Sequence, residues 1–158
     1  MNNLKKAIIA MLVASLGMLT LVSCSSGGSE VSLKSIEESI TKATDVSYLQ
    51  KIDDNVLEQI YGIKPGDVEE YFGYYTPVNV KADEIIVLKA KDEAAAKALV
   101  AKVEQRVKNQ EKAFERYLPE VYDQVKAHVI KQDGNYVFMS ISPDVEKISK
   151  AFDESLKK

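Results

Sequence analysis

The sequence contains few side chains of the types that perform nucleophilic catalysis or bind zinc. Histidine and cysteine occur once each, as His128 and Cys24. A Ser-His-Asp or Cys-His site would have to use His128, and a zinc site would need several such ligands. His128 begins an apolar segment with Val129 and Ile130, where a partly buried histidine without a catalytic role is the simpler interpretation. We therefore assign no catalytic, cofactor-binding or metal-binding residue from the sequence.

Adjacent acidic residues are the remaining candidates for catalysis, because two carboxylates can act as an acid and a base when the fold brings them together. Most of the pairs stand at expected helix starts or turns, where capping and solvation explain them. The pairs are Glu37-Glu38, Asp53-Asp54, Glu69-Glu70, Asp83-Glu84 and Asp92-Glu93. The sequence therefore favours a protein without enzymatic activity. The alternative is a cell-envelope hydrolase that uses a carboxylate pair, with Glu84 among the candidate residues.

Cys24 has a different chemical role, which its position indicates. It follows an uncharged apolar stretch at residues 7–23, which two lysines precede, as in a secretory signal peptide. The motif Leu21-Val22-Ser23-Cys24 resembles the lipobox of bacterial lipoproteins, and this resemblance implies cleavage before Cys24 and acylation of its sulfur. The alternative is an uncleaved membrane anchor, for which the stretch is at the lower limit of length.

A lipid on Cys24 would also explain how the protein stays at a membrane. Removal of Lys5 and Lys6 with the signal peptide changes the formal net charge from −3 to −5, so surface charge would repel both nucleic acids and anionic lipid headgroups. Two acyl chains suffice for stable anchoring, at about 0.8 kcal/mol per buried methylene. We expect no nucleic-acid partner and a location on the extracytoplasmic face of the cell membrane, held there by diacylglycerol and palmitate.

Composition and patterning predict three parts of the chain. The signal peptide covers residues 1–23, and a Ser- and Gly-rich tether follows at 24–30. A single domain is expected at 31–158, since 46% of the residues are hydrophobic and 28% are charged. This length can bury one core without disulfides or a metal.

Hydrophobic periodicity predicts an α+β fold for that domain. Helical spacing occurs at 32–44, 55–61, 92–116, 119–125 and after Pro143, and strand patterns occur at 69–76, 84–91, 128–132 and 136–142. The strands come in adjacent pairs, which predicts an antiparallel four-stranded sheet with a ββαββα core after two N-terminal helices. Helices on one face would complete a two-layer sandwich. Residues 85–88 are apolar at every position, so their strand is expected at the centre of the sheet.

Tyrosines form the least ordinary local feature. Tyr71, Phe72, Tyr74 and Tyr75 occur within five residues, and two further tyrosines flank Pro119. Strand alternation would place Tyr71 and Tyr75 on one side and Phe72 and Tyr74 on the other, so one set can simply be core. Exposed tyrosines can also contact sugars, peptides or a partner protein. The candidate contacts with an unknown envelope protein or ligand are Tyr71, Tyr74, Tyr75, Tyr117 and Tyr122.

The order of several short motifs resembles a family of small bacterial lipoproteins that is catalogued only as a domain of unknown function, mostly in Gram-positive anaerobes. The motifs are Tyr61-Gly62-Ile63, Ala82-Asp83-Glu84-Ile85, Gln110 with Phe114, Tyr117 and Pro119, and Gly134-Asn135-Tyr136-Val137. The resemblance implies export and a single domain, and it brings no known activity. We expect a membrane-anchored lipoprotein that acts as a non-enzymatic binding or accessory module.

Overall fold

The computed structural model describes residues 31–157, so the signal peptide, the tether and the lipidation of Cys24 lie outside the described residues. The elements in chain order are α2 (Leu33–Ala43), β1 (Gln50–Lys51), α3 (Asp54–Val56), the π-helix η1 (Leu57–Tyr61), the 3-10 helix η2 (Pro65–Asp67), β2 (Glu70–Tyr75), β3 (Glu84–Lys89), α4 (Glu93–Phe114), α5 (Pro119–Lys126), β4 (Val129–Asp133), β5 (Tyr136–Ile141) and α6 (Val145–Ser155). No helix in this range is long and apolar enough to cross a membrane.

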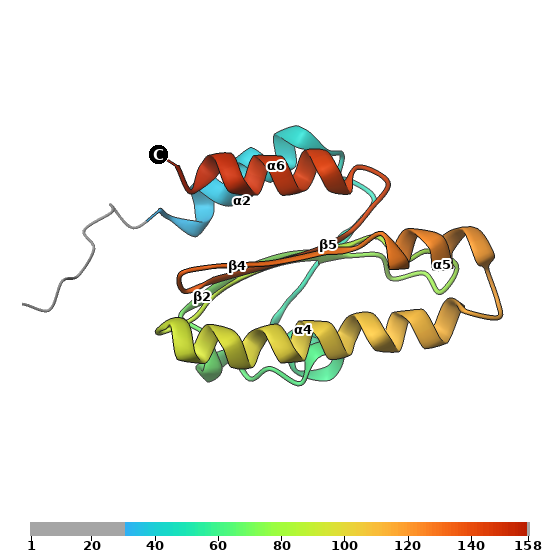
Figure 1. Ribbon diagram of the computed structural model, residues 1–158, viewed down its shortest axis with the longest axis horizontal. Coiled ribbons are helices and arrows are strands. Elements are labelled where there is room, and N and C mark those ends of the chain that lie inside the picture. The colour runs from blue at the N-terminus through green and yellow to red at the C-terminus, as the bar shows by residue number, and fades with distance from the viewer. Residues whose placement is uncertain (1–30, 158) are drawn as a thin grey trace, which may run out of the picture. The chain divides into compact units, whose positions relative to one another are not determined.

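One antiparallel sheet organises the domain, with the strand order β1-β2-β3-β5-β4 (Figure 1). The α+β class and the antiparallel pairing are confirmed. Strand β3 lies at the centre and all six of its residues are buried, as its apolar pattern predicted. The expected count of four strands needs correction, because Gln50 and Lys51 add a fifth strand at the edge beside Tyr74 and Tyr75. This strand is too short and too exposed to leave a hydrophobic pattern.

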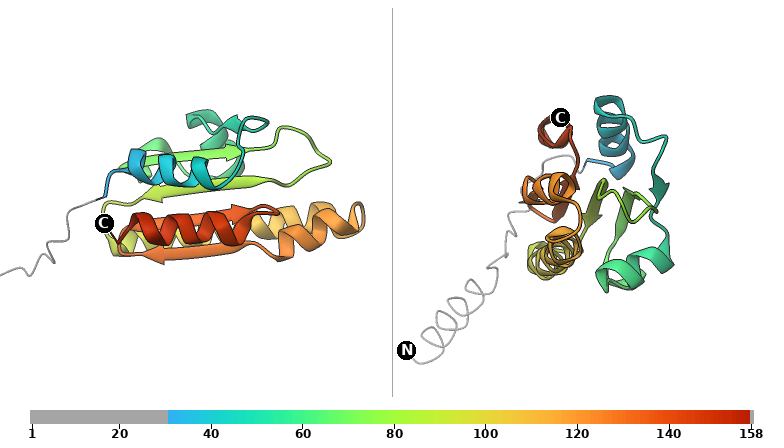
Figure 2. Two further views of the ribbon diagram at one scale, coloured as in Figure 1. Left: turned by 90° about the horizontal axis from the view of Figure 1, so that it is seen from above. Right: turned by 90° about the vertical axis from the view of Figure 1, so that its right-hand side faces the viewer.

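The expectation of helices on one face also needs correction, because helices cover both faces of the sheet (Figures 1 and 2). Helices α2 and α6 pack on one face, where Ile36, Phe138 and Phe152 meet in the core. Helix α4 and the α3–η1 segment cover the other face, over Ile86 and Leu88. The physical reason is that every residue of β3 and β5 is buried, and a strand with apolar side chains on both sides needs cover on both sides.

Helix α4 places the polar groups described below. It begins after Asp92, whose carboxylate accepts a hydrogen bond of 2.7 Å from the Ala95 N–H. Its buried stripe is formed by Ala96, Leu99, Val103, Val107 and Phe114. Arg106 and Gln110 are partly buried within this stripe, and their spacing of four residues puts both on the same face of the helix. The end of α4 therefore presents polar side chains toward the sheet.

The two ends of the sheet carry different structures. The start of α2 and the C-terminal end of α6 lie at one end of the sheet, and α4 starts at the same end on the opposite face (Figure 1). The loop from Thr76 to Asp83, which joins β2 to β3, lies at the opposite end together with the turn between α4 and α5 (Figure 2). The candidate site forms at this second end.

Candidate functional site

A buried carboxylate lies at the base of the candidate site. Glu84 is the first residue of β3, and only 1% of its surface is exposed. Strand alternation puts its side chain on the same face as Ile86 and Leu88, under α4. A charged group at such a position is unfavourable unless it is paired and hydrogen-bonded. The chemical role of Glu84 therefore depends on the side chains that pair with its carboxylate.

Three side chains donate hydrogen bonds to the Glu84 carboxylate. Arg106 donates from Nη2 to Oε2 at 2.6 Å and from Nε to Oε1 at 3.0 Å, which makes a two-point ion pair. Gln110 donates from Nε2 to Oε2 at 3.3 Å. The Tyr61 hydroxyl donates a short hydrogen bond to Oε1. The carboxylate is thus held from α4 on one side and from η1 on the other.

The backbone of η1 explains how Tyr61 reaches Glu84. Residues 57–61 form a π-helical turn, a wider turn that occurs mostly as a single turn and is frequent at functional sites. Gly62 ends it with φ +62°, a left-handed conformation that favours glycine. Tyr61 is 4% exposed and packs in the core beneath α4. The sequence Tyr61-Gly62 therefore combines the hydroxyl donor with the residue that ends the turn.

Electrostatics keep Tyr61 and Arg106 each in one protonation state. Burial and the negative charge of Glu84 raise the pKa of the Tyr61 hydroxyl well above its ordinary value, so the hydroxyl remains a donor. Burial by itself lowers the pKa of Arg106, but the hydrogen bonds and the charge of Glu84 outweigh it, and the net effect raises that pKa. Arg106 therefore stays charged and fixed in orientation across the physiological pH range.

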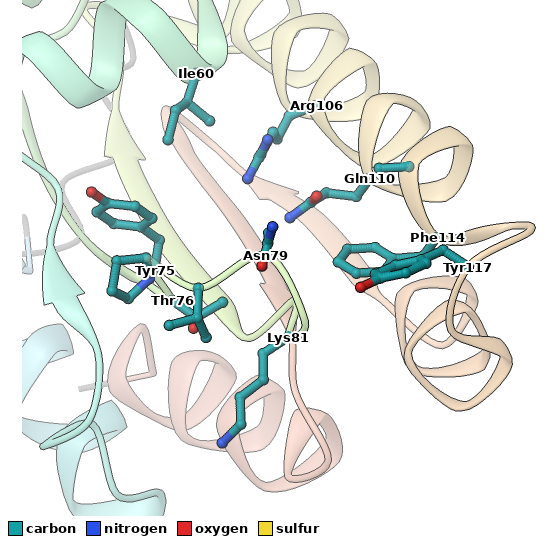
Figure 3. Close-up of a pocket in the computed structure, with 12 residues that line it drawn as sticks. Ile60, Tyr75, Thr76, Asn79, Lys81, Arg106, Gln110, Phe114 and Tyr117 are labelled. Carbon is teal, nitrogen blue, oxygen red and sulfur yellow. The ribbon is translucent and has the colours of Figure 1, made fainter.

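An open pocket of about 410 Å³ adjoins this cluster through Arg106 and Gln110 (Figure 3). Arg106 and Gln110 form part of its wall, and the loop between β2 and β3 forms the opposite part. The complete lining is Ile60, Tyr75, Thr76, Pro77, Val78, Asn79, Lys81, Arg106, Gln110, Ala113, Phe114 and Tyr117. Its volume lies in the lower part of the range for small-molecule sites, about 300–1,000 Å³.

Three polar side chains converge inside the pocket. Arg106, Gln110 and Asn79 point toward one another in Figure 3, with Phe114 and Tyr117 to one side of them. Lys81 extends away from this group, and its ammonium lies 5.1 Å from the centre of the Tyr48 ring. The pocket therefore joins a cluster of hydrogen-bond donors to an apolar and aromatic wall.

The five tyrosines that the sequence indicated as candidate contacts lie at different places in the structure. Tyr75 and Tyr117 line the pocket, and Tyr117 is 60% exposed. Tyr74 is buried on the α2 side, where its hydroxyl donates to Glu37 at 2.5 Å. Tyr71 donates to Asp54 at 2.6 Å, and Tyr122 packs partly against the core under the ammonium of Lys126. The structure thus brings two of the five together at the site.

The other candidates for chemistry have structural partners. His128 lies half-buried after α5, with Nδ1 2.8 Å from the carbonyl oxygen of Val125. Asp53 and Asp92 cap the starts of α3 and α4, as expected for acids at helix N-termini. Within residues 31–157, no group of three or more histidine, cysteine or acidic side chains is arranged to hold a metal ion.

Sequence reasoning named Glu84 only as a possible catalytic acid and did not identify Arg106, Gln110, Tyr61 or Asn79 as site residues. An available signal was the polar pair Arg106 and Gln110 inside an otherwise apolar helical stripe, since such positions need a buried partner. Their partner is separated by more than twenty residues along the chain. Local sequence patterns carry no information on such a pairing.

Comparison with known proteins gives one match. The sequence model of a family described as "Domain of unknown function (DUF4358)" matches residues 42–142. This range contains the whole Glu84 cluster and every residue that lines the pocket. No curated protein matches the chain, and no solved structure does.

Proposed function

The chain belongs to the DUF4358 family, and we propose that it is a lipid-anchored lipoprotein whose extracytoplasmic domain binds a ligand or partner without catalysing a reaction. The lipobox at Cys24 and the preceding apolar stretch support the anchor. The family resemblance favours a Gram-positive bacterium as host, with the protein on the outer face of the cytoplasmic membrane. The observation that carries the binding role is the pocket with converging donors over the buried Arg106–Glu84 pair.

The arrangement of this pocket suits binding because two of its polar groups, Arg106 and Gln110, are fixed before any ligand arrives. Arg106 cannot rotate freely, since both oxygens of Glu84 hold its guanidinium. Fixed donors reduce the entropy that a ligand would otherwise lose when it orders them. The loop between β2 and β3 and the end of α4, which line the pocket, lie at the opposite end of the domain from the start of α2 (Figure 1). A tether that joins the domain at residue 31 would leave the pocket accessible from outside.

The same geometry argues against a hydrolase that uses Glu84. A general acid or base must reach the substrate, whereas the Glu84 carboxylate is 1% exposed. Its oxygens accept hydrogen bonds from Arg106, Gln110 and Tyr61, none of which is a carboxylate. A carboxylate that is held by three donors is suited to orienting them.

The anchor is tested by expressing the full chain in a Gram-positive host that is fed an alkyne analogue of palmitate. The wild type should carry the label and sediment with membranes, and Cys24→Ser should lose the label. Intact-mass measurement should show that residues 1–23 are absent. A protein that retains Met1 or carries an unmodified thiol at position 24 would contradict the anchor.

Binding without catalysis is tested by two measurements on the same preparations. Capture of partners or glycans from detergent-solubilised envelopes should be weakened by Tyr117→Ala, which changes a pocket residue. It should be unaffected by Asn109→Ala, which changes an exposed residue of α4 that does not line the pocket. Screening on peptidoglycan fragments and peptides should show no turnover. A measured turnover that one Asp or Glu substitution abolishes would overturn the proposal.

A further inference from the structure

We infer that the pocket binds an organic monoanion, a carboxylate attached to an apolar or aromatic body. This inference rests on the proposed binding function and specifies the class of ligand. The carboxylate would lie against Arg106, Gln110 and Asn79, and the apolar body would lie against Phe114 and Tyr117. Three independent observations support this inference. They are the charge of the lining residues, the free hydrogen-bond donors and the apolar wall of the pocket.

The charge of the lining favours an anion. Its twelve residues include two cations, Arg106 and Lys81, and no acid. This composition contrasts with a chain of formal net charge −3. Glu84 behind the wall balances the charge of Arg106. The one excess positive charge of the lining is therefore that of Lys81, which extends away from the three converging side chains and would attract an anion without contacting it. A single excess charge complements a monoanion such as a carboxylate better than a doubly charged phosphate.

The donors left over from the Glu84 interaction match the oxygens of a carboxylate. Arg106 donates to Glu84 from Nε and Nη2, and within the described part of the chain no hydrogen bond uses its Nη1. Gln110 donates to Glu84 from Nε2, which carries two hydrogens. The exposed Asn79 brings a second amide to the same point in Figure 3. Charge-assisted hydrogen bonds from such donors are about twice as strong as neutral ones.

The apolar wall and the size of the pocket define the rest of the ligand. Phe114, Tyr117, Ile60 and Val78 offer a surface for one ring or branched side chain. A volume of about 410 Å³ holds an aromatic acid or the last two or three residues of a peptide. Because the pocket is open on one side, the carboxylate of the ligand can belong to a free acid or to the C-terminus of a peptide. The experiment distinguishes these two sources.

The test measures binding to the full chain, purified in detergent, by isothermal titration calorimetry. The probes are 3-phenylpropanoate, its neutral amide, and an N-acetylated tripeptide of two alanines and a terminal phenylalanine, with a free or an amidated C-terminus. Each carboxylate should bind at least about 10-fold more tightly than its amide. Tighter binding of the tripeptide than of the free acid would assign the peptide C-terminus as the source, and the reverse would assign a free acid.

Asn79→Ala provides the variant, because Asn79 lies exposed in a loop and its loss does not leave a buried group unpaired. We expect carboxylate affinity to fall about 5- to 10-fold. The matched control is Asn109→Ala, an exposed position on α4 that does not line the pocket, where affinity should not change.

Three results would overturn the inference. The first is that the amides bind as tightly as the acids. The second is that Asn79→Ala does not weaken carboxylate binding, and the third is that neither acid binds at concentrations up to about 10 mM. In each case the proposed binding function would still stand if capture of another partner depended on Tyr117. A measured turnover would instead contradict the proposed function, whether or not carboxylates bind.

Discussion

Removing the positive charge from the buried Arg106–Glu84 pair tests whether the pair is the structural base of the pocket. In Arg106→Met, methionine replaces the aliphatic stem of arginine without a charge. The Glu84 carboxylate, 1% exposed, then loses its two-point partner and cannot reach water. An unpaired buried charge of this kind lowers the free energy of unfolding by about 3–5 kcal/mol.

The reciprocal substitution should be less damaging. The Arg106 side chain is 18% exposed, so in Glu84→Met its long stem can turn the guanidinium to solvent. The main loss is then the acceptor of the Tyr61 hydroxyl, which is buried and would cost about 1–3 kcal/mol if unsatisfied. Once residue 84 carries no charge, Arg106→Met leaves no further group unpaired. The double variant should therefore equal Glu84→Met within about 0.5 kcal/mol.

Urea unfolding at pH 7, followed by far-ultraviolet circular dichroism, measures all four proteins of this cycle. Lys150→Met is the control, because Lys150 and Glu154 form an exposed ion pair whose removal should leave the free energy of unfolding unchanged. Additive effects of Arg106→Met and Glu84→Met would refute the reasoning. A loss of less than about 1 kcal/mol for Arg106→Met would do so as well.

Three further predictions, on Tyr61, Gly73 and Asp92, are tested by the same unfolding assay. The raised pKa of Tyr61 keeps its hydroxyl protonated in the folded protein, whereas the unfolded chain ionises near pH 10. The resulting contribution is complete below about pH 10 and decreases at higher pH. The difference in the free energy of unfolding between wild type and Tyr61→Phe should therefore shrink as the pH rises above about 10, and a constant difference up to about pH 11 would contradict this. In Gly73→Ala the new Cβ would lie 2.6 Å from Ile52 Cδ1 and 2.9 Å from the Ile85 carbonyl oxygen, which should cost about 1–3 kcal/mol. Gly66→Ala meets nothing within 4 Å and should change little, so equal effects at the two glycines would refute the steric explanation. Asp92→Ala removes the cap of α4 and should cost about 1 kcal/mol, and an unchanged stability would show that the cap is dispensable.

The hydrophobic pattern of the sequence predicted the antiparallel sheet because burial leaves a periodic trace. Strand β3 was placed at the centre from its apolar residues alone, and the structure confirms that position. The same apolar residues on both sides of β3 already required helices on both faces, which the two-layer prediction did not take into account. Strand β1 left no trace, because its two exposed residues pair only at the edge.

The site was less predictable than the fold, because its residues are distant in sequence. Glu84 was recognisable as a candidate by its type, but its partners determine its role. Those partners come from η1 and α4, and Asn79 comes from a loop whose local sequence does not distinguish it. Their meeting depends on which helix covers which face of the sheet. Hydrophobic periodicity gives the buried side of a helix and leaves its neighbours undetermined.

Stability alone does not explain a buried ion pair at this position. Well-packed apolar residues of similar volume are often as stabilising as such a pair, or more so. The Arg106–Glu84 pair additionally fixes the orientation of the Arg106 donors, because the carboxylate holds the plane of the guanidinium at the wall of the pocket. Methionine at both positions would fill the same space and present no donor. Glu84→Met keeps Arg106 and Gln110 and removes only the carboxylate that holds them. If this variant stays folded but no longer binds carboxylates, the pair serves to orient the donors that contact the ligand.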